Sequence, residues 1–157
     1  MRIRSDCSAL ESIPLRLMII AVVAALSVVP AAEALETLES KDFVRRAVLQ
    51  MDYVISTAQV LAIEGPGSVR TVLLDFGGGG SVRFDSISIG DREGGSNMSS
   101  AILTLSSGAR IVRSASDPPV CMRSPEGHAV HLETPVAKLR LSCELLNATW
   151  YVLVEVV

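Results

Sequence analysis

The feature that most constrains this chain is an uncharged apolar stretch close to its N-terminus. Residues 17–32 carry no charged side chain, and Ile13 and Leu15 extend the stretch if Arg16 reaches toward the lipid headgroups. A helix needs roughly 20 apolar residues to cross the hydrocarbon layer of a bilayer. We therefore interpret the stretch as a transmembrane helix that is just long enough to cross.

The charges on the two sides of this stretch predict its orientation. Arginines precede it and acidic residues dominate the segment after it. They are Arg2, Arg4 and Arg16 before the stretch, and Glu33, Glu36, Glu39 and Asp42 after it. Because basic residues stay preferentially on the cytoplasmic side, we expect the N-terminus in the cytoplasm and residues after about 34 outside the cell.

Two other interpretations of the stretch stay open. A cleaved secretory signal has an apolar core followed by small residues, and Pro30 followed by Ala32-Glu33-Ala34 fits that pattern. A buried helix of a soluble protein would need apolar neighbours on every side, which a chain of 157 residues can hardly supply. Cleavage after Ala34 would identify the secretory signal.

The distribution of glycine divides the chain into two unlike halves. All eleven glycines lie between Gly65 and Gly127, and none lies in the first 64 residues. From residue 35 to 63, apolar residues recur every three or four positions, which predicts an amphipathic helix that ends at Gly65. Its apolar face consists of Val44, Val48, Met51, Ile55, Ala58 and Ala62.

We expect three parts: a short charged leader at 1–12, a transmembrane and amphipathic helix at 13–64, and a β-rich head at 65–157. In the head the apolar period shifts toward two, as in strands with one buried face. Strand candidates lie at 69–76, 81–89, 101–105, 109–113, 128–133, 136–145 and 149–157. Strands at this spacing predict an antiparallel β-sandwich or barrel, so the expected fold class is α+β.

The glycine run at 77–80 was tested against the pattern of a phosphate-binding loop. Such loops need a Lys-Ser/Thr pair at a fixed spacing or a glycine fingerprint that opens a helix, whereas Ser81 here opens a predicted strand. We therefore expect a plain hairpin loop.

Two cysteines and two histidines in the head formally supply a zinc ligand set: Cys121, His128, His131 and Cys143. His128 and His131 lie an odd number of residues apart on one predicted strand, so their side chains point to opposite faces. We expect no metal site and no cofactor. Outside the cell, a Cys121–Cys143 disulfide is plausible, and the alternative is a pair of free buried thiols.

Other motifs bear on the class of protein. The triplets that begin at Asn97 and Asn147 match the N-glycosylation pattern, and both lie in the segment expected outside the cell. A net charge of −3 argues against a nucleic-acid partner, since such proteins normally carry a basic face. No serine lies in a nucleophile-elbow motif and no paired carboxylates stand out, so we do not expect an enzyme.

The order of parts is distinctive. A leader with Arg2 and Arg4 precedes Glu11, the apolar helix follows with Pro30 late in it, and a Gly-Pro-Gly turn at 65–67 opens the head. This order resembles the type IV pilin and archaellin superfamily, in particular small archaeal pilin-like proteins with class III signal peptides. The layout matches over the whole chain, and the motif residues cover about 25 positions.

The resemblance implies a mechanism of assembly. A membrane peptidase would remove the leader, the apolar helices would bundle into a filament core, and the β-rich heads would face the medium. Cleavage between Asp6 and Cys7 would make Glu11 the fifth residue, which in that family pairs with the N-terminal amine of the neighbouring subunit.

We therefore expect a non-enzymatic, membrane-anchored, pilin-like structural subunit of a cell-surface filament. Its partners would be membrane lipid and other pilin-like subunits that contact its N-terminal helix. The alternative is a secreted or membrane-anchored β-sandwich binding module of the cell envelope.

Overall fold

The structure is a computed structural model that describes residues 8–78, 80–146 and 149–157. Side chains are described from Leu15 onward, except at positions 27 and 29 and in the two gaps. The chain forms two compact units, Met1–Leu38 and Glu39–Val157. The described part of the first unit is entirely helical, and the second unit holds every described strand.

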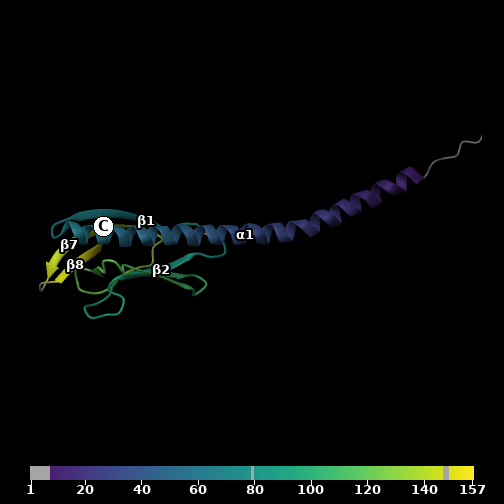
Figure 1. Cartoon of the computed structure of the whole chain (residues 1–157). Coiled ribbons are helices and arrows are strands. Elements are labelled where there is room, and N and C mark those ends of the chain that lie inside the picture. Colours follow the sequence, from purple (N-terminus) through teal and green to yellow (C-terminus); the bar gives the residue numbers. More distant parts are fainter. Residues whose placement is uncertain (1–7, 79, 147–148) are drawn as a thin grey trace, which may run out of the picture. The chain divides into compact units, whose positions relative to one another are not determined.

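Helix α1 spans Ser8–Glu64 and runs from purple to teal in Figure 1. It ends where Gly65, at φ 91°, donates its N–H to the Leu61 carbonyl over 3.0 Å, an end typical of a glycine in the left-handed conformation. The Ser68 hydroxyl donates to the Gly65 carbonyl over 2.7 Å. The predicted helix end at Gly65 is therefore confirmed.

The strands form two four-stranded sheets, with orders β1-β7-β8-β5 and β4-β3-β2-β6. Their bounds are β1 Val69–Asp75, β2 Phe84–Ile89, β3 Ser100–Leu105, β4 Arg110–Ser114, β5 Cys121–Arg123, β6 Val130–Leu132, β7 Val136–Leu146 and β8 Thr149–Val156. Among the described strands, β5 and β8 pair in parallel and the other pairings are antiparallel. The expected α+β class, with a long N-terminal helix and a β-sandwich head, is confirmed.

The chain crosses from one sheet to the other at the β1–β2, β4–β5, β5–β6 and β6–β7 connections. β2 with β3, β3 with β4, and β7 with β8 are consecutive strands that pair antiparallel within one sheet. β1 pairs with β7, whereas β2 pairs with β3 and β6. The glycine run at 77–80 therefore lies in a connection between two sheets, and the prediction of a hairpin loop was wrong.

One core unites the strands with one face of α1 inside the second unit. Met51, Ile55 and Ala58, which the apolar period assigned to the buried face, are buried. The helix contributes Phe43, Ala47, Met51, Val54, Ile55, Ala58 and Leu61 to the same core as strand residues such as Leu74, Ile89, Leu103, Met122 and Leu141.

The division between the two units falls inside α1, after Leu38, whereas the distribution of glycine predicted a boundary at Gly65. The reason is that helix residues from Phe43 to Leu61 share a core with the strands. The distribution of glycine marks the change from helix to strand, and packing continues across that change.

The described side chains of the first unit, from Leu15 to Leu38, are all exposed. Large apolar side chains occur on every side of this part of the helix, among them Leu17, Ile20, Val23 and Leu26. With a mean hydropathy of 2.3 over its most apolar window, α1 is long and apolar enough to cross a membrane.

Candidate functional site

The most unusual surface of the second unit lies on α1, on the face turned away from the core. We call it the outer stripe and define it as Leu49, Tyr53, Ser56, Val60 and Ile63. The four apolar side chains are 59%, 57%, 38% and 74% exposed in chain order. The Ser56 hydroxyl donates to the Tyr53 carbonyl over 3.0 Å, so its hydrogen-bonding capacity is partly used within the helix.

The spacing of the outer stripe is that of a helix–helix contact. Its members follow one another at intervals of four, three, four and three residues. This is the 3.5-residue period that keeps apolar residues on one seam facing another helix. A solvent-exposed face of an ordinary surface helix would instead carry polar residues.

Hydrogen bonds on both flanks hold the stripe outward. On one side, the Gln50 amide donates to the Asp75 carbonyl and accepts the Asp75 N–H over 2.6 Å, which pairs the backbone groups of Asp75 at the free edge of β1. On the other side, the Arg113 guanidinium makes two bonds to the Asp52 carboxylate, of 2.6 and 2.9 Å. Since these contacts fix the rotation of the helix, its own head cannot cover the stripe.

Toward Glu39 the same face of α1 becomes charged. Glu39, Asp42 and Arg46 continue the spacing of the stripe and are exposed, as are Lys41 and Arg45 beside them. Asp42 and Arg46 lie one turn apart and form an ion pair of 3.1 Å. The face therefore has a charged half that precedes an apolar half within the second unit.

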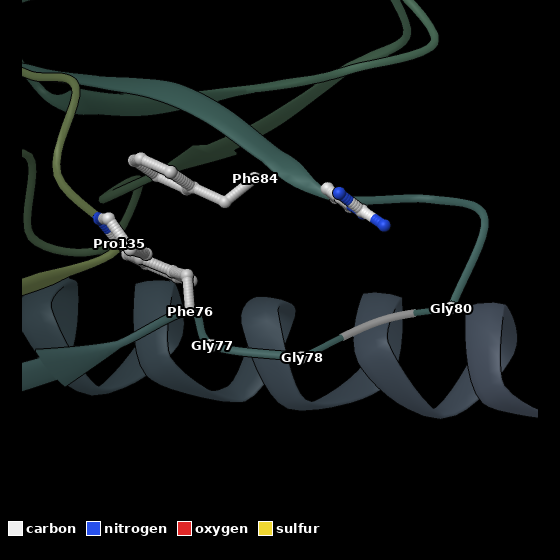
Figure 2. Close-up of a pocket in the computed structure, with 7 residues that line it drawn as sticks. Phe76, Gly77, Gly78, Gly80, Phe84 and Pro135 are labelled. Carbon is white, nitrogen blue, oxygen red and sulfur yellow. The ribbon is translucent and has the colours of Figure 1, made fainter.

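A pocket of about 460 Å³ lies where the β1–β2 connection leaves the first sheet. Figure 2 shows Phe76, Phe84 and Pro135 gathered at one end of the pocket, with Gly77 next to Phe76 and Gly80 at the far end. The two phenyl rings stack with centroids 5.1 Å apart and planes 7° from parallel. They form a flat apolar wall.

The glycine loop brings polar groups to this pocket. Arg83 lines it, and the Arg46 guanidinium lies 3.8 Å from the place where a Cβ on Gly78 would stand. The Gly77 N–H donates to the Asp75 carboxylate over 2.8 Å, which fixes the start of the loop. An apolar wall with a cationic rim suits a small ligand that has one flat apolar face and one acidic group.

The structure does not bring Cys121 and Cys143 together. They lie on β5 and β7, the two neighbours of β8, opposite Tyr151 and Val152 respectively. Two strand spacings amount to about 10 Å, beyond the roughly 7 Å that a disulfide spans between Cα atoms. Both cysteines are free thiols in the structure, which was the alternative to the disulfide.

The two thiols also differ in environment. Cys143 is fully buried in the core, and burial, together with the nearby Glu144 carboxylate, raises the pKa of its thiol. Cys121 is half-buried, and its neighbour Met122 points into the core, so Cys121 points to the opposite face of the sheet.

The histidines occupy different elements, contrary to the prediction that one strand carries both. β6 begins only at Val130, and the His128 carbonyl accepts the Ser124 N–H over 2.7 Å in the preceding turn. His131 is exposed on β6, with Nε2 3.7 Å from the Glu133 carboxylate. Among the residues that the structure describes, no three His, Cys, Asp or Glu side chains gather in a metal-binding group.

Asn97 lies in a well-fixed turn between β2 and β3. Its N–H donates to the Asp91 carboxylate over 3.3 Å, and its carbonyl accepts the Ser100 N–H over 3.0 Å. The side chain is half-buried. Asn147, the other predicted acceptor, lies outside the described residues.

Glu11 lies within α1, but its side chain is outside the part of the helix whose side chains are described. The pairing role that the resemblance implies for Glu11 therefore stays a prediction. So does the cleavage between Asp6 and Cys7, because residues 1–7 are outside the described chain.

One polar cluster was missed from the sequence. The Arg123 guanidinium lies 4.0 Å from the centre of the Tyr151 ring and 3.7 Å from the Glu93 carboxylate. Burial and the Glu93 carboxylate raise the pKa of Tyr151. This cluster joins the β2–β3 loop to β5 and β8, and only the unpredicted strand β5 brings its members together.

The outer stripe was also missed, although its signal is present in the sequence. The amphipathic period was assigned to one apolar face, and the second apolar row at 49, 53, 60 and 63 was not distinguished from it. Counting both rows separately would have found a helix with two apolar faces.

Comparisons of the chain with protein-family models, with curated proteins and with solved structures found no match.

Proposed function

We propose that this protein is a non-enzymatic, membrane-anchored, pilin-like structural subunit of a cell-surface filament. The observation that supports it best is that α1 exposes apolar side chains in both units. Residues from Leu15 to Val28 expose them around the helix, and the outer stripe exposes them along one face. A single isolated molecule in water would leave all this surface uncovered, at a cost of roughly 25 cal/mol per Å².

Lipid and neighbouring helices would cover different parts of this surface. The apolar part of the first unit suits a bilayer, with the arginine-bearing N-terminus in the cytoplasm and the head outside. The outer stripe suits a helix. In this proposal the leader is removed by a membrane peptidase, and Glu11 pairs with the N-terminal amine of a neighbouring subunit, because a carboxylate within lipid is costly without a partner.

The test combines the mass of the mature protein with one substitution. Cleavage between Asp6 and Cys7, and loss of sedimentable filaments in Glu11→Ala, are the expected results. Glu33→Ala is the matched control, because it removes an acidic residue from the same helix beyond the apolar stretch. Filament recovery from Glu11→Ala at the control level would remove the proposed role of Glu11.

The pocket beside Phe76 and Phe84 favours the second candidate, a β-sandwich binding module of the cell envelope. That module would need no filament and would be either secreted or anchored. The same mass measurement separates the two candidates, since cleavage after Ala34 would indicate secretion and an intact N-terminus a simple anchor.

A further inference from the structure

We propose that the pocket beside Phe76 and Phe84 binds an aromatic monocarboxylate, with its ring against the stacked phenyl rings and its carboxylate on Arg83 and Arg46. The proposal goes beyond the filament role and specifies the ligand that the second candidate function leaves open. It does not depend on assembly, because every residue involved lies in the second unit, Glu39–Val157.

The first step is that the pocket has room for a ligand and a face for a ring. Its volume of about 460 Å³ lies within the roughly 300–1,000 Å³ of small-molecule sites. The Phe76 and Phe84 rings are nearly parallel, with Pro135 gathered beside them (Figure 2). Phe84 is only half-buried, so part of it remains accessible to a ligand. Since aromatic rings attract one another in stacked arrangements, a flat ring suits this wall better than a branched aliphatic group.

The second step is that the glycine loop keeps the approach to a cation open. A Cβ on Gly78 would stand 3.8 Å from the Arg46 guanidinium, so a longer side chain there would compete for the space beside that guanidinium. Gly78 also has φ 79°, a conformation that favours glycine. The backbone of the loop therefore lies beside Arg46 without covering it.

The third step is that the pocket carries one uncompensated positive charge. Arg83 is the charged member of the described residues that line the pocket, and no carboxylate of a described residue forms an ion pair with it. Arg46 adds a guanidinium, but the Asp42 carboxylate already pairs with its Nε over 3.1 Å. The Asp75 carboxylate accepts the Gly77 N–H and does not line the pocket. This balance favours an acid with a single negative charge.

The backbone of Arg83 is held on both sides by one residue. Its N–H donates to the Ser106 hydroxyl over 3.0 Å, and its carbonyl accepts the Ser106 N–H over 2.9 Å. The guanidinium on this fixed backbone presents N–H groups in a planar fork that matches the two oxygens of a carboxylate. A ligand that joins an aromatic ring to a carboxylate can therefore contact the apolar wall and the fork at the same time.

The experiment measures binding of naphthalene carboxylate to the full-length protein in phosphatidylcholine nanodiscs by equilibrium dialysis, with binding to empty nanodiscs subtracted. Two analogues of similar size separate the contributions: naphthalene carboxamide lacks the charge, and decalin carboxylate lacks the aromatic ring. We expect the carboxamide to bind roughly tenfold more weakly, because hydrogen bonds between two charged groups are the stronger ones. We expect decalin carboxylate to bind severalfold more weakly, because it cannot stack.

Two variants connect these preferences to the pocket. Arg83→Gln should remove the preference for the carboxylate over the carboxamide. Phe84→Leu keeps an apolar side chain and should remove the preference for naphthalene over decalin. Arg92→Gln is the matched control, because Arg92 is exposed beyond the other end of β2 and should leave both preferences unchanged.

The outcomes that would overturn the site are distinct. Equal binding of the carboxylate and the carboxamide would remove the role of the cations, and equal binding of naphthalene and decalin carboxylates would remove the role of the rings. Preferences that persist in Arg83→Gln and Phe84→Leu would place the ligand elsewhere. Absence of binding above that of empty nanodiscs would overturn the site and leave the filament proposal standing, because that proposal rests on α1 and Glu11.

Discussion

At the scale of single residues, Gly90 is the glycine where the structure leaves least room for a side chain. It has φ 71°, and a Cβ on it would lie 2.0 Å from the Met122 carbonyl oxygen. Two hydrogen bonds hold the backbone at this distance. The Gly90 N–H donates to the Ser100 carbonyl, and the Asp91 N–H donates to the Met122 carbonyl. Because Gly90 has no side chain, the backbone of the β2–β3 loop can lie in direct contact with the backbone of β5.

A non-glycine residue in the left-handed conformation costs about 1–3 kcal/mol. We predict that Gly90→Ala lowers the free energy of unfolding by more than this, because its Cβ would also clash with Met122. Gly94→Ala is the matched control, because Gly94 has φ 79° but its Cβ would meet nothing within 4 Å. Denaturant unfolding of both variants gives the comparison. Equal losses would mean that the loop moves away from Met122 at little cost.

At the scale of elements, local pattern predicted most strands and the helix. Seven of the strands overlap the ranges that alternation marked, and β3, β4 and β7 extend one residue beyond them. The pattern works because a strand with one buried face repeats every second residue. β5 was missed because three residues after two prolines carry no period, and its pairing with β8 depends on tertiary structure. Because β5 was not predicted, the Arg123–Tyr151 contact was missed as well. For the same reason nothing in the sequence showed that Cys121 and Cys143 lie on strands separated by β8.

Helix α1 offers a comparison between its two apolar faces. Met51 is fully buried in the core, whereas Leu49, two residues earlier, is 59% exposed on the outer stripe. We predict that Met51→Ala costs about 2–5 kcal/mol of stability and that Leu49→Ala costs less than about 0.5 kcal/mol. Thermal unfolding measures both variants.

The second half of this prediction concerns assembly. Leu49→Ala should reduce the yield of filaments although the head remains stable, because Leu49 contributes only to the outer stripe. A Leu49→Ala protein that unfolds early would mean that this side chain packs on its own head. A stable variant with normal filament yield would remove Leu49 from the assembly surface.

At the scale of the whole molecule, the chain has two units whose boundary lies within one helix. The sequence predicted a helix followed by strands, but it could not locate the boundary, because the same helical period continues on both sides of Leu38. What differs is the neighbour of the apolar face. Before residue 39 every described side chain is exposed, and from Phe43 to Leu61 seven apolar side chains are buried with the strands.

This arrangement predicts which truncated chains fold. A chain that begins at Glu39 keeps the whole core and should unfold cooperatively in denaturant. A chain that begins at Gly65 loses five large buried side chains: Phe43, Met51, Val54, Ile55 and Leu61. Each is worth about 1.5–3 kcal/mol of burial, so the loss is comparable with the roughly 5–15 kcal/mol that stabilises a typical domain. We expect this chain to lack a cooperative transition in circular dichroism. If both chains unfolded at the same denaturant concentration, the helix would be an attachment to an independently stable sandwich, and the exposed outer stripe would no longer be fixed in place by the head.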